Sequence, residues 1–270
     1  MHINVVHLGT VPYALGLDLQ RELIAVRKLG TIADTLLLLE HKPVITLGRN
    51  AKRHNVVASD ELLQQRGVEL FECDRGGDVT FHGPGQLVGY PIFDLFSYEP
   101  RIGAVGFMRR MEEVLIRTCA DFGIACQREP GLTGVWTKAN SPLRHGGAEQ
   151  DFGNTNAGTF AKIAALGIHI SRGITSHGFA LNVNTDLDYF NLIVPCGIAG
   201  KPVTSMRQEL GAEQPMARVA DAISRHFGQV FGRQVLWLDT IDALFGRKVG
   251  VPLTAPAELR AIAGDEVQSA

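Results

Sequence analysis

The chain has 270 residues, of which 45% are hydrophobic and 20% charged, so it can bury a sizeable core as a globular protein. Its net charge of −2, without a block of basic residues, argues against a nucleic-acid-binding protein. No apolar run approaches the ~20 residues that a membrane span needs, and the first ten residues lack the pattern of a signal peptide. The four cysteines are widely spaced, which is typical of reduced thiols, so we expect a cytoplasmic protein that does not insert into a membrane.

The apolar residues in the first half of the chain predict strands that alternate with helices. The helical spacing of Leu15, Leu19 and Leu23 indicates a helix, and Gly30 suits its end. Consecutive leucines at 36–39 indicate a strand that is buried on both faces. We expect strands at 3–8, 35–39, 44–47, 68–73 and 87–93, and helices at 13–28, 59–66 and 105–122.

The second half continues this alternation after one interruption. Residues 160–170 and 174–183 predict two paired strands joined by a tight turn. Ahead of them a strand begins at 134–136, and residues 137–158, polar and rich in Asn and Gly, predict a mobile surface insertion. We therefore predict a single α/β domain over residues 1–263. The remaining expected elements are a short helix from Ser205, helices at 215–230 and 254–262, a strand at 235–238 and a frayed tail at 264–270.

The densest group of glycines, here called the glycine cluster, lies at residues 75–86 with the sequence RGGDVTFHGPGQ. Glycine-rich turns expose backbone N–H groups and let a ligand approach the main chain. The cluster lacks the Gly-Lys-Ser/Thr ending of a Walker loop, and it precedes a strand where a dinucleotide-binding motif needs a helix. The alternative is a pair of ordinary tight turns. Tight turns do not require the side chains of Arg75, Thr80 and His82, which lie among the glycines. We therefore interpret the cluster as a ligand-binding loop.

Cys196 lies between Pro195 and Gly197, after an apolar run at 192–194 that we interpret as a strand. Proline stiffens the backbone and glycine permits a close approach, so the thiol is placed where a nucleophile can act. An inert buried cysteine is the alternative, because reactivity needs a partner that lowers the thiol pKa. Lys162 is a candidate partner if its amine is held inside the protein, and its alternative is a side chain that extends to water.

The nine histidines do not form a recognisable metal-binding motif. His82, His169 and His177 lie at or near turns, but no pair of His or Cys residues has the spacing of metal ligands, so we expect no metal site. A hydrolase that pairs Cys196 with His82 or His177 is chemically reasonable. His145 lies inside the insertion, where we expect it to be solvated.

Four segments taken together resemble the lipoyl(octanoyl) transferase family. They are RGGDVTFHGPGQLVGYPI at 75–92, KIAALG at 162–167, HGFALNVN at 177–184 and VPCGI at 194–198. The likeness extends from about residue 39 to residue 206. Asp78 and Phe81 occupy positions at which the family varies, and the insertion is longer than expected. The resemblance implies an enzyme that moves an octanoyl group from acyl carrier protein to a lysine of a lipoyl-domain protein.

The resemblance carries the functional residues of the family onto this chain. It implies that Cys196 is the nucleophile and that Lys162 is the acid and base of a cysteine–lysine dyad. The implied substrate-binding residues are Arg75, Gly76, Gly77, Asp78, Val79, Thr80, Phe81, His82, Ala165, Leu166, Gly167, Gly178, Phe179 and Ala180.

The resemblance also implies a mixed β-sheet flanked by helices, as in the catalytic domains of biotin and lipoate protein ligases. The donor is octanoyl-acyl carrier protein, and the acceptors are lipoyl-domain proteins such as 2-oxoacid dehydrogenase E2 subunits and the glycine cleavage H protein. Because an acyl thioester is already activated, neither a cofactor nor ATP is expected. Two alternatives stay open: an ATP-dependent lipoate- or biotin-type ligase, and a non-catalytic protein that binds acyl carrier or lipoyl-domain proteins.

Overall fold

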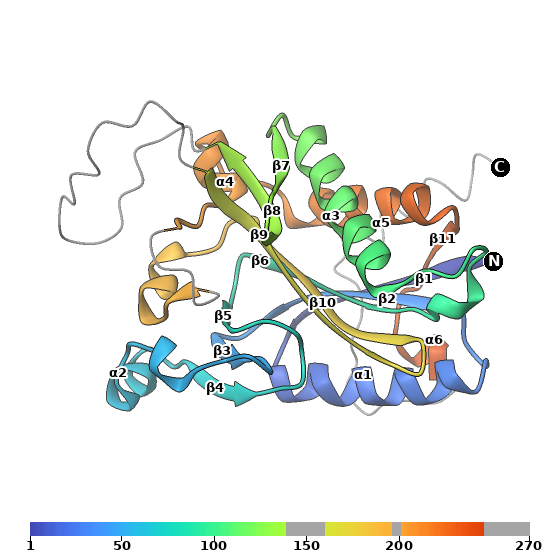
Figure 1. Cartoon of the computed structure of the whole chain (residues 1–270), viewed down its shortest axis with the longest axis horizontal. Coiled ribbons are helices and arrows are strands. Elements are labelled where there is room, and N and C mark those ends of the chain that lie inside the picture. Colours follow the sequence, from blue (N-terminus) through green and yellow to red (C-terminus); the bar gives the residue numbers. More distant parts are fainter. Residues whose placement is uncertain (139–159, 196–200, 246–270) are drawn as a thin grey trace.

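The computed structural model describes residues 1–138, 160–195 and 201–245, and Figure 1 shows how their strands and helices are arranged. Cys196, most of the predicted insertion, the predicted helix at 254–262 and the tail at 264–270 lie outside these residues. The strands are β1 (His2–Val11), β2 (Asp34–His41), β3 (Val44–Leu47), β4 (Glu69–Glu72), β5 (Val79–His82), β6 (Gln86–Ile92), β7 (Cys126–Glu129), β8 (Leu132–Lys138), β9 (Phe160–Ser171), β10 (Ile174–Asn182) and β11 (Gln234–Trp237). The helices are α1 (Tyr13–Lys28), α2 (Asp60–Gln65), α3 (Ala104–Asp121), α4 (Met206–Leu210), α5 (Met216–Phe231) and α6 (Asp242–Phe245).

Eight strands form the central sheet, in the order β11-β1-β2-β6-β10-β9-β8-β7. The three strands β11, β1 and β2 run parallel to one another. Each of the other neighbouring pairs is antiparallel. The sheet is therefore mixed, and the predicted pairing of β9 with β10 is confirmed.

Helices cover both faces of the central sheet, with α1 on one side and α3 and α5 on the other (Figure 1). Because successive side chains of a strand point to opposite faces, β2 contributes to both layers. Leu36 and Leu38 pack in the core that contains α3 and α5, whereas Leu37 and Leu39 pack in the core that contains α1. All four leucines are fully buried, so the predicted burial of this strand on both faces is confirmed.

A second sheet of three strands, in the order β4-β3-β5, has a core of its own. β3 pairs in parallel with β4 and antiparallel with β5. Leu63 of α2 and Phe190 of the 3-10 helix Leu187–Leu192 close this smaller core. The glycine cluster contains β5 and leads directly into β6 of the central sheet, so it lies at the junction of the two sheets.

Two sequence-based boundaries are wrong. The strand that begins near residue 134 is not interrupted at Thr137, because β8 continues to Lys138. Thr137 is buried and pairs with β7 on one side and with β9 on the other. Its β-branched side chain suits a strand, although its neighbours in the sequence are polar.

The second error concerns the residues before Cys196. The apolar run at 192–194 was expected to be a strand, but Leu192 ends the 3-10 helix Leu187–Leu192. Ile193 forms only an isolated antiparallel bridge with Val56. A short apolar run in a sequence indicates burial but does not show whether the segment is a strand. Here Leu192 and Ile193 are buried in the core of the smaller sheet without forming one.

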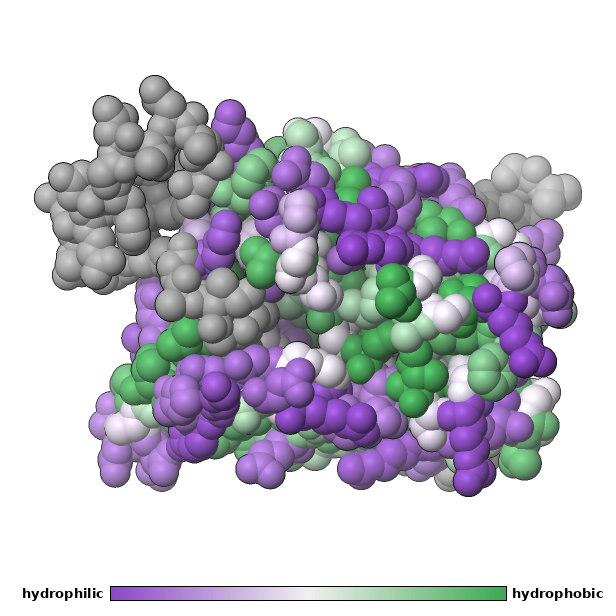
Figure 2. Space-filling model, in the orientation of Figure 1, coloured by the Kyte–Doolittle hydropathy of each residue, from purple (hydrophilic) through white to green (hydrophobic). Residues whose placement is uncertain are grey.

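Figure 2 shows hydrophobic residues grouped across the middle of one face, between hydrophilic bands along its upper and lower edges. The group covers the region where Figure 1 draws α3 and the β9–β10 hairpin. None of the described helices combines the length and the apolar composition needed to cross a bilayer.

Candidate active site

A cavity of about 220 Å³ lies between the glycine cluster and the middle of the β9–β10 hairpin. The structure brings Lys162 and all but one of the predicted substrate-binding residues to its wall. Cys196 lies outside the described residues. The predicted residues that line the cavity are Arg75, Gly76, Gly77, Asp78, Val79, Thr80, His82, Lys162, Ala165, Leu166, Gly167, Gly178, Phe179 and Ala180.

Phe81 is the predicted residue that the structure places elsewhere. It lies in β5, where alternate side chains face opposite ways, so it points away from Thr80 and His82. Its ring stacks on Tyr189 at a centroid distance of 4.7 Å and meets Phe190 edge-on at 5.7 Å. Phe81 therefore belongs to the core of the smaller sheet, a role that the resemblance could not separate from substrate binding.

Hydrogen bonds from Arg75 anchor the glycine cluster to strand β3. Its buried guanidinium donates hydrogen bonds to the carbonyl of Thr46 at 2.6 Å, to Thr46 Oγ1 at 2.9 Å and to the carbonyl of Gly76 at 3.1 Å. The Gly76 N–H donates to the carbonyl of Ile168 at 3.0 Å. The loop is therefore bonded to β3 on one side and to β9 on the other.

The contact between Gly167 and the glycine cluster leaves no room for a side chain. A Cβ at Gly167 would lie 2.6 Å from the carbonyl oxygen of Gly76, so a substitution must push two backbone segments apart. We expect Gly167→Ala to lower the free energy of unfolding by about 1–3 kcal/mol and to reduce the acyl transfer that the sequence resemblance implies, because the cavity wall moves. Thermal unfolding and a transfer assay check both effects.

Gly106→Ala is the matched control, because Gly106 occupies an exposed position of α3 and the nearest atom to a Cβ there is Ile102 Cγ2 at an ordinary 3.7 Å. If Gly167→Ala unfolds at the parent temperature and transfers at the parent rate, the tight contact does not shape the cavity.

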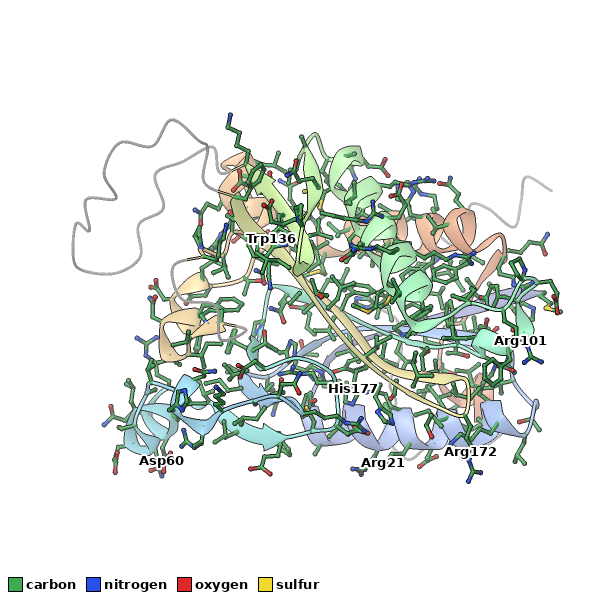
Figure 3. All side chains as sticks on the ribbon, in the orientation of Figure 1. Arg21, Asp60, Arg101, Trp136, Arg172 and His177 are labelled. Carbon is green, nitrogen blue, oxygen red and sulfur yellow. The ribbon has the colours of Figure 1, made fainter. Side chains whose placement is uncertain are left out.

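Lys162 is held inside the protein, with only 7% of the residue exposed. Its Nζ lies 4.8 Å from the centroid of the Trp136 ring, a cation–π contact, and Figure 3 shows Trp136 on β8. Gly134 leaves space for the lysine, since a Cβ there would lie 3.1 Å from Lys162 Cε. The backbone N–H of Lys162 donates to the carbonyl of Pro202, and its carbonyl accepts from the Thr204 N–H, both at 2.9 Å. The chain that follows Cys196 is therefore bonded to the backbone of this lysine.

Two tyrosines in the cavity wall are not among the residues predicted from the sequence. Tyr13 begins α1 and Tyr90 lies inside β6, and neither interrupts the apolar pattern around it, so no local signal marks them. The Tyr13 ring stacks against His82 at 6.3 Å, and the Tyr90 hydroxyl lies 2.6 Å from His41 Nε2. The wall also contains Val88, Gly131, Leu132, Thr133 and His177.

His82, in the cavity wall, and His41, whose ring centroid lies 6.0 Å from that of His82, are neutral at physiological pH. Burial, with the electrostatic interaction with His41 as a smaller cause, lowers the pKa of His82 to about 3. Burial likewise lowers the pKa of His41 to about 4. The polar end of the cavity therefore presents uncharged imidazole and phenol groups beside the cation of Arg75.

His177 has a backbone conformation that is uncommon for a residue with a side chain, with φ +54°. Its N–H donates to Gln20 Oε1 and its Nε2 donates to Asp74 Oδ1, both at 2.7 Å. Burial lowers the pKa of His177, although the hydrogen bond to Asp74 opposes this shift. Figure 3 shows His177 between the β9–β10 hairpin and α1, where two contacts hold the strained residue at the cavity wall.

Three cysteines fall within the described residues, and all three are free thiols. Cys119 is buried, whereas Cys73 and Cys126 are partly exposed. In residues 1–138, 160–195 and 201–245, no group of three or more His, Cys, Asp or Glu side chains is arranged to hold a metal ion.

Comparison with known proteins identifies the family. Residues 12–228 match the family model described as the lipoyl protein ligase A/B catalytic domain. The chain is 57% identical to an octanoyltransferase of Koribacter versatilis over 98% of both chains, and 56% identical to one of Acidobacterium capsulatum over 89% of this chain and 94% of the other. A bipartite lipoate protein ligase of Thermoplasma acidophilum has the same fold, with a TM-score of 0.63 at 13% identity, covering 100% of this chain and 93% of that one. The chain therefore belongs to the octanoyltransferases, acyltransferases within the lipoyl protein ligase A/B catalytic domain family.

Proposed function

We propose that the protein transfers an octanoyl group from octanoyl-acyl carrier protein to a lysine of a lipoyl-domain protein in the cytoplasm. The acyl group passes through a thioester on Cys196, and Lys162 moves the protons. The acceptors are E2 subunits of 2-oxoacid dehydrogenases and the glycine cleavage H protein. The observation that carries the proposal is the buried Lys162 in the cavity wall, with its backbone bonded to the chain that follows Cys196.

Hydrogen bonds connect both described ends of the segment that contains Cys196 to the cavity wall, one end through Asn55 and the other directly to Lys162. Before it, the Val194 N–H donates to the carbonyl of Asn55 at 2.7 Å. The Asn55 side chain in turn donates to Asp78, a cavity residue, at 2.8 Å. After it, Pro202 bonds to Lys162. These anchors support a nucleophile that works together with the cavity.

The chemistry needs only a thiolate, a base and the acyl donor. The thiolate attacks the thioester carbonyl, the bond to the carrier sulfur breaks, and the carrier sulfur takes a proton from the Lys162 ammonium and leaves as a thiol, so that Lys162 becomes neutral. The amine of the acceptor lysine then attacks the acyl-enzyme, the amide bond forms, and the Cys196 sulfur leaves. An ammonium beside the cysteine favours its thiolate, and a neutral lysine amine accepts the proton that the attacking amine loses.

The cavity also offers apolar surface for the acyl chain. Val88, Leu132, Leu166 and Phe179 contribute apolar side chains to its wall. Each methylene group that they bury contributes about 0.8 kcal/mol to binding, so a medium-length chain gains affinity until the cavity is full. This lining supports an acyl substrate.

Intact-mass measurement of the enzyme tests the proposal directly. Incubated with octanoyl-acyl carrier protein, without acceptor and without ATP, the parent should gain the mass of one octanoyl group. Cys73→Ala, Cys119→Ala and Cys126→Ala should gain the same mass, because their thiols take no part. An adduct that requires ATP would indicate a ligase, and one that peptide mapping assigns to Cys73, Cys119 or Cys126 would contradict the assignment of Cys196.

A further inference from the structure

A chain of buried amide groups connects His82, in the cavity wall, to the segment that follows Cys196. The Asn182 side chain donates from Nδ2 to the carbonyl of Thr204 at 2.9 Å. Gln86 donates from Nε2 to Asn182 Oδ1 at 2.9 Å and to the carbonyl of Phe81 at 3.2 Å. Gln86 Oε1 then lies 2.7 Å from His82 Nδ1. All four residues of the chain, His82, Gln86, Asn182 and Thr204, are buried.

The direction of each hydrogen bond in this chain follows from its fixed end. The Thr204 carbonyl can only accept, so Asn182 must turn its NH₂ group towards it and its oxygen towards Gln86. Gln86 must then present its NH₂ group to Asn182, an orientation that the Phe81 carbonyl also requires. The remaining Gln86 oxygen can only accept, so the hydrogen of the bond lies on His82 Nδ1.

We infer that His82 is held as the neutral Nδ1–H tautomer and that its Nε2 accepts a hydrogen bond from an N–H group of a substrate in the cavity. Burial, and then the nearby His41, keep the pKa of His82 at about 3, and the Arg75 and His177 charges act in the same direction. Nε2 therefore carries no proton at neutral pH. Among residues 1–138, 160–195 and 201–245, the His82 ring hydrogen-bonds only to Gln86, through Nδ1, and the ring lines the cavity.

The Tyr90 oxygen is a second hydrogen-bond acceptor in the same wall, because a carbonyl again fixes the direction of the hydrogen bonds. His41 Nδ1 lies 2.9 Å from the carbonyl of Val11, which can only accept, so the hydrogen lies on Nδ1. His41 Nε2 is then an acceptor, and the Tyr90 hydroxyl donates its hydrogen to it at 2.6 Å. Within the described part of the chain no other group donates to the Tyr90 oxygen, and burial raises the pKa of Tyr90, which keeps the phenol neutral.

This inference rests on the proposed function for the identity of the ligand. The octanoyl thioester group itself has hydrogen-bond acceptors and C–H groups but no N–H donor. His82 Nε2 and the Tyr90 oxygen therefore do not bind the acyl group. The reaction supplies N–H groups in two places: the attacking lysine amine, and the amide groups of the arm that carries the thioester. His82 orients such a group without keeping a proton, which leaves proton transfer to Lys162. Gln86 and Asn182 are positioning residues that act through His82.

The tautomer is measured by ¹⁵N–¹H correlation spectra of histidine-labelled full-length enzyme, with the His82 signals assigned by their loss in His82→Gln. We expect a neutral His82 with the proton on Nδ1 at pH 7. Gln86→Leu removes the acceptor that fixes this tautomer, so the signals should change to those of Nε2–H or of an exchanging mixture. Gln127→Leu, at an exposed position on edge strand β7, is the matched control and should leave His82 unchanged. An Nε2–H tautomer or a doubly protonated His82 in the parent overturns the inference.

Half-reaction kinetics identify which N–H group is bound. Gln86→Leu should slow one half-reaction about threefold to tenfold, the usual effect of losing one hydrogen bond, while Gln127→Leu slows neither. If the acceptor domain attacks the acyl-enzyme more slowly, the group that donates to His82 Nε2 is the lysine amine. If acylation of the enzyme is slower instead, the group is an amide of the arm that carries the thioester. If Gln86→Leu is folded and both half-reactions keep the parent rate, Nε2 does not bind a substrate N–H group. Gln86→Met, which is similar in length and has no amide oxygen, replaces Gln86→Leu if the latter fails to fold. A parent enzyme without any acyl-enzyme would instead contradict the proposed function and would leave the tautomer measurement valid.

Discussion

Replacement of Cys196 by serine should abolish the acyl-enzyme and lower octanoyl transfer on the order of 10³-fold or more. The sulfur reacts as a thiolate, whose population a neighbouring cation increases at neutral pH. A serine hydroxyl stays protonated at the same pH and is a far weaker nucleophile. Intact mass after incubation with donor alone, together with a steady-state assay with an acceptor domain, measures both effects.

Cys73→Ser is the control for this change, because Cys73 is a partly exposed thiol whose sulfur donates to the Leu47 carbonyl at 3.5 Å, and serine keeps a donor at this position. It should retain acylation and transfer. If Cys196→Ser still gains an octanoyl group at the parent rate, the nucleophile is another residue and the thioester mechanism is wrong.

Replacement of Lys162 by alanine or by arginine should lower overall transfer by about 10²- to 10⁴-fold, the usual contribution of a general acid–base. The two variants differ in charge. Arginine keeps a cation near the cysteine but cannot give up its proton, so it should preserve thiolate reactivity and still fail as a base. Alanine removes both roles. The rate of Cys196 alkylation by iodoacetamide should be measured as a function of pH, because the midpoint of this profile reports the pKa of the thiol. We expect the midpoint to move to higher pH in Lys162→Ala and to move much less in Lys162→Arg.

Lys138→Ala provides a matched lysine control two register positions away from Lys162 along the β8–β9 pair. Lys138 is exposed and should be replaceable without loss of transfer. Thermal unfolding of Lys162→Ala should also be recorded, because this variant loses the contact with Trp136. Parent-level transfer in Lys162→Ala would end the dyad proposal and would leave His82 or His177 as the base to test.

The elements that the sequence predicted well are those with a local signature of burial. Helix α1 has the predicted bounds, and α3 and α5 each begin and end within one residue of them, because one apolar stripe fixes a helix face. The run at 192–194 carries no such periodicity, so its apolar residues indicate burial but not the backbone conformation that achieves it.

The candidate site was predictable to the extent that its residues lie in continuous motifs. Such a motif does not say which face of a strand a residue occupies, which is why Phe81 was grouped with its neighbours Thr80 and His82. Tyr13 and Tyr90 could not be found at all, because they reach the cavity only through the packing of distant segments. The orientation of the Gln86 amide depends in the same way on a carbonyl more than a hundred residues later, at Thr204.

The position of β1 in the central sheet has a consequence for how the nascent chain folds on the ribosome. β1 is synthesised before the other strands of the central sheet, yet one of its edges pairs with β11, whose residues Gln234–Trp237 are translated more than two hundred residues later. Synthesis proceeds at about 5–20 residues per second, so this edge stays without its native partner for at least ~10 s. An unpaired strand edge is a template for pairing with other chains. The apolar strand β1 therefore depends on α1 and β2, which follow it immediately, to protect it until translation reaches β11.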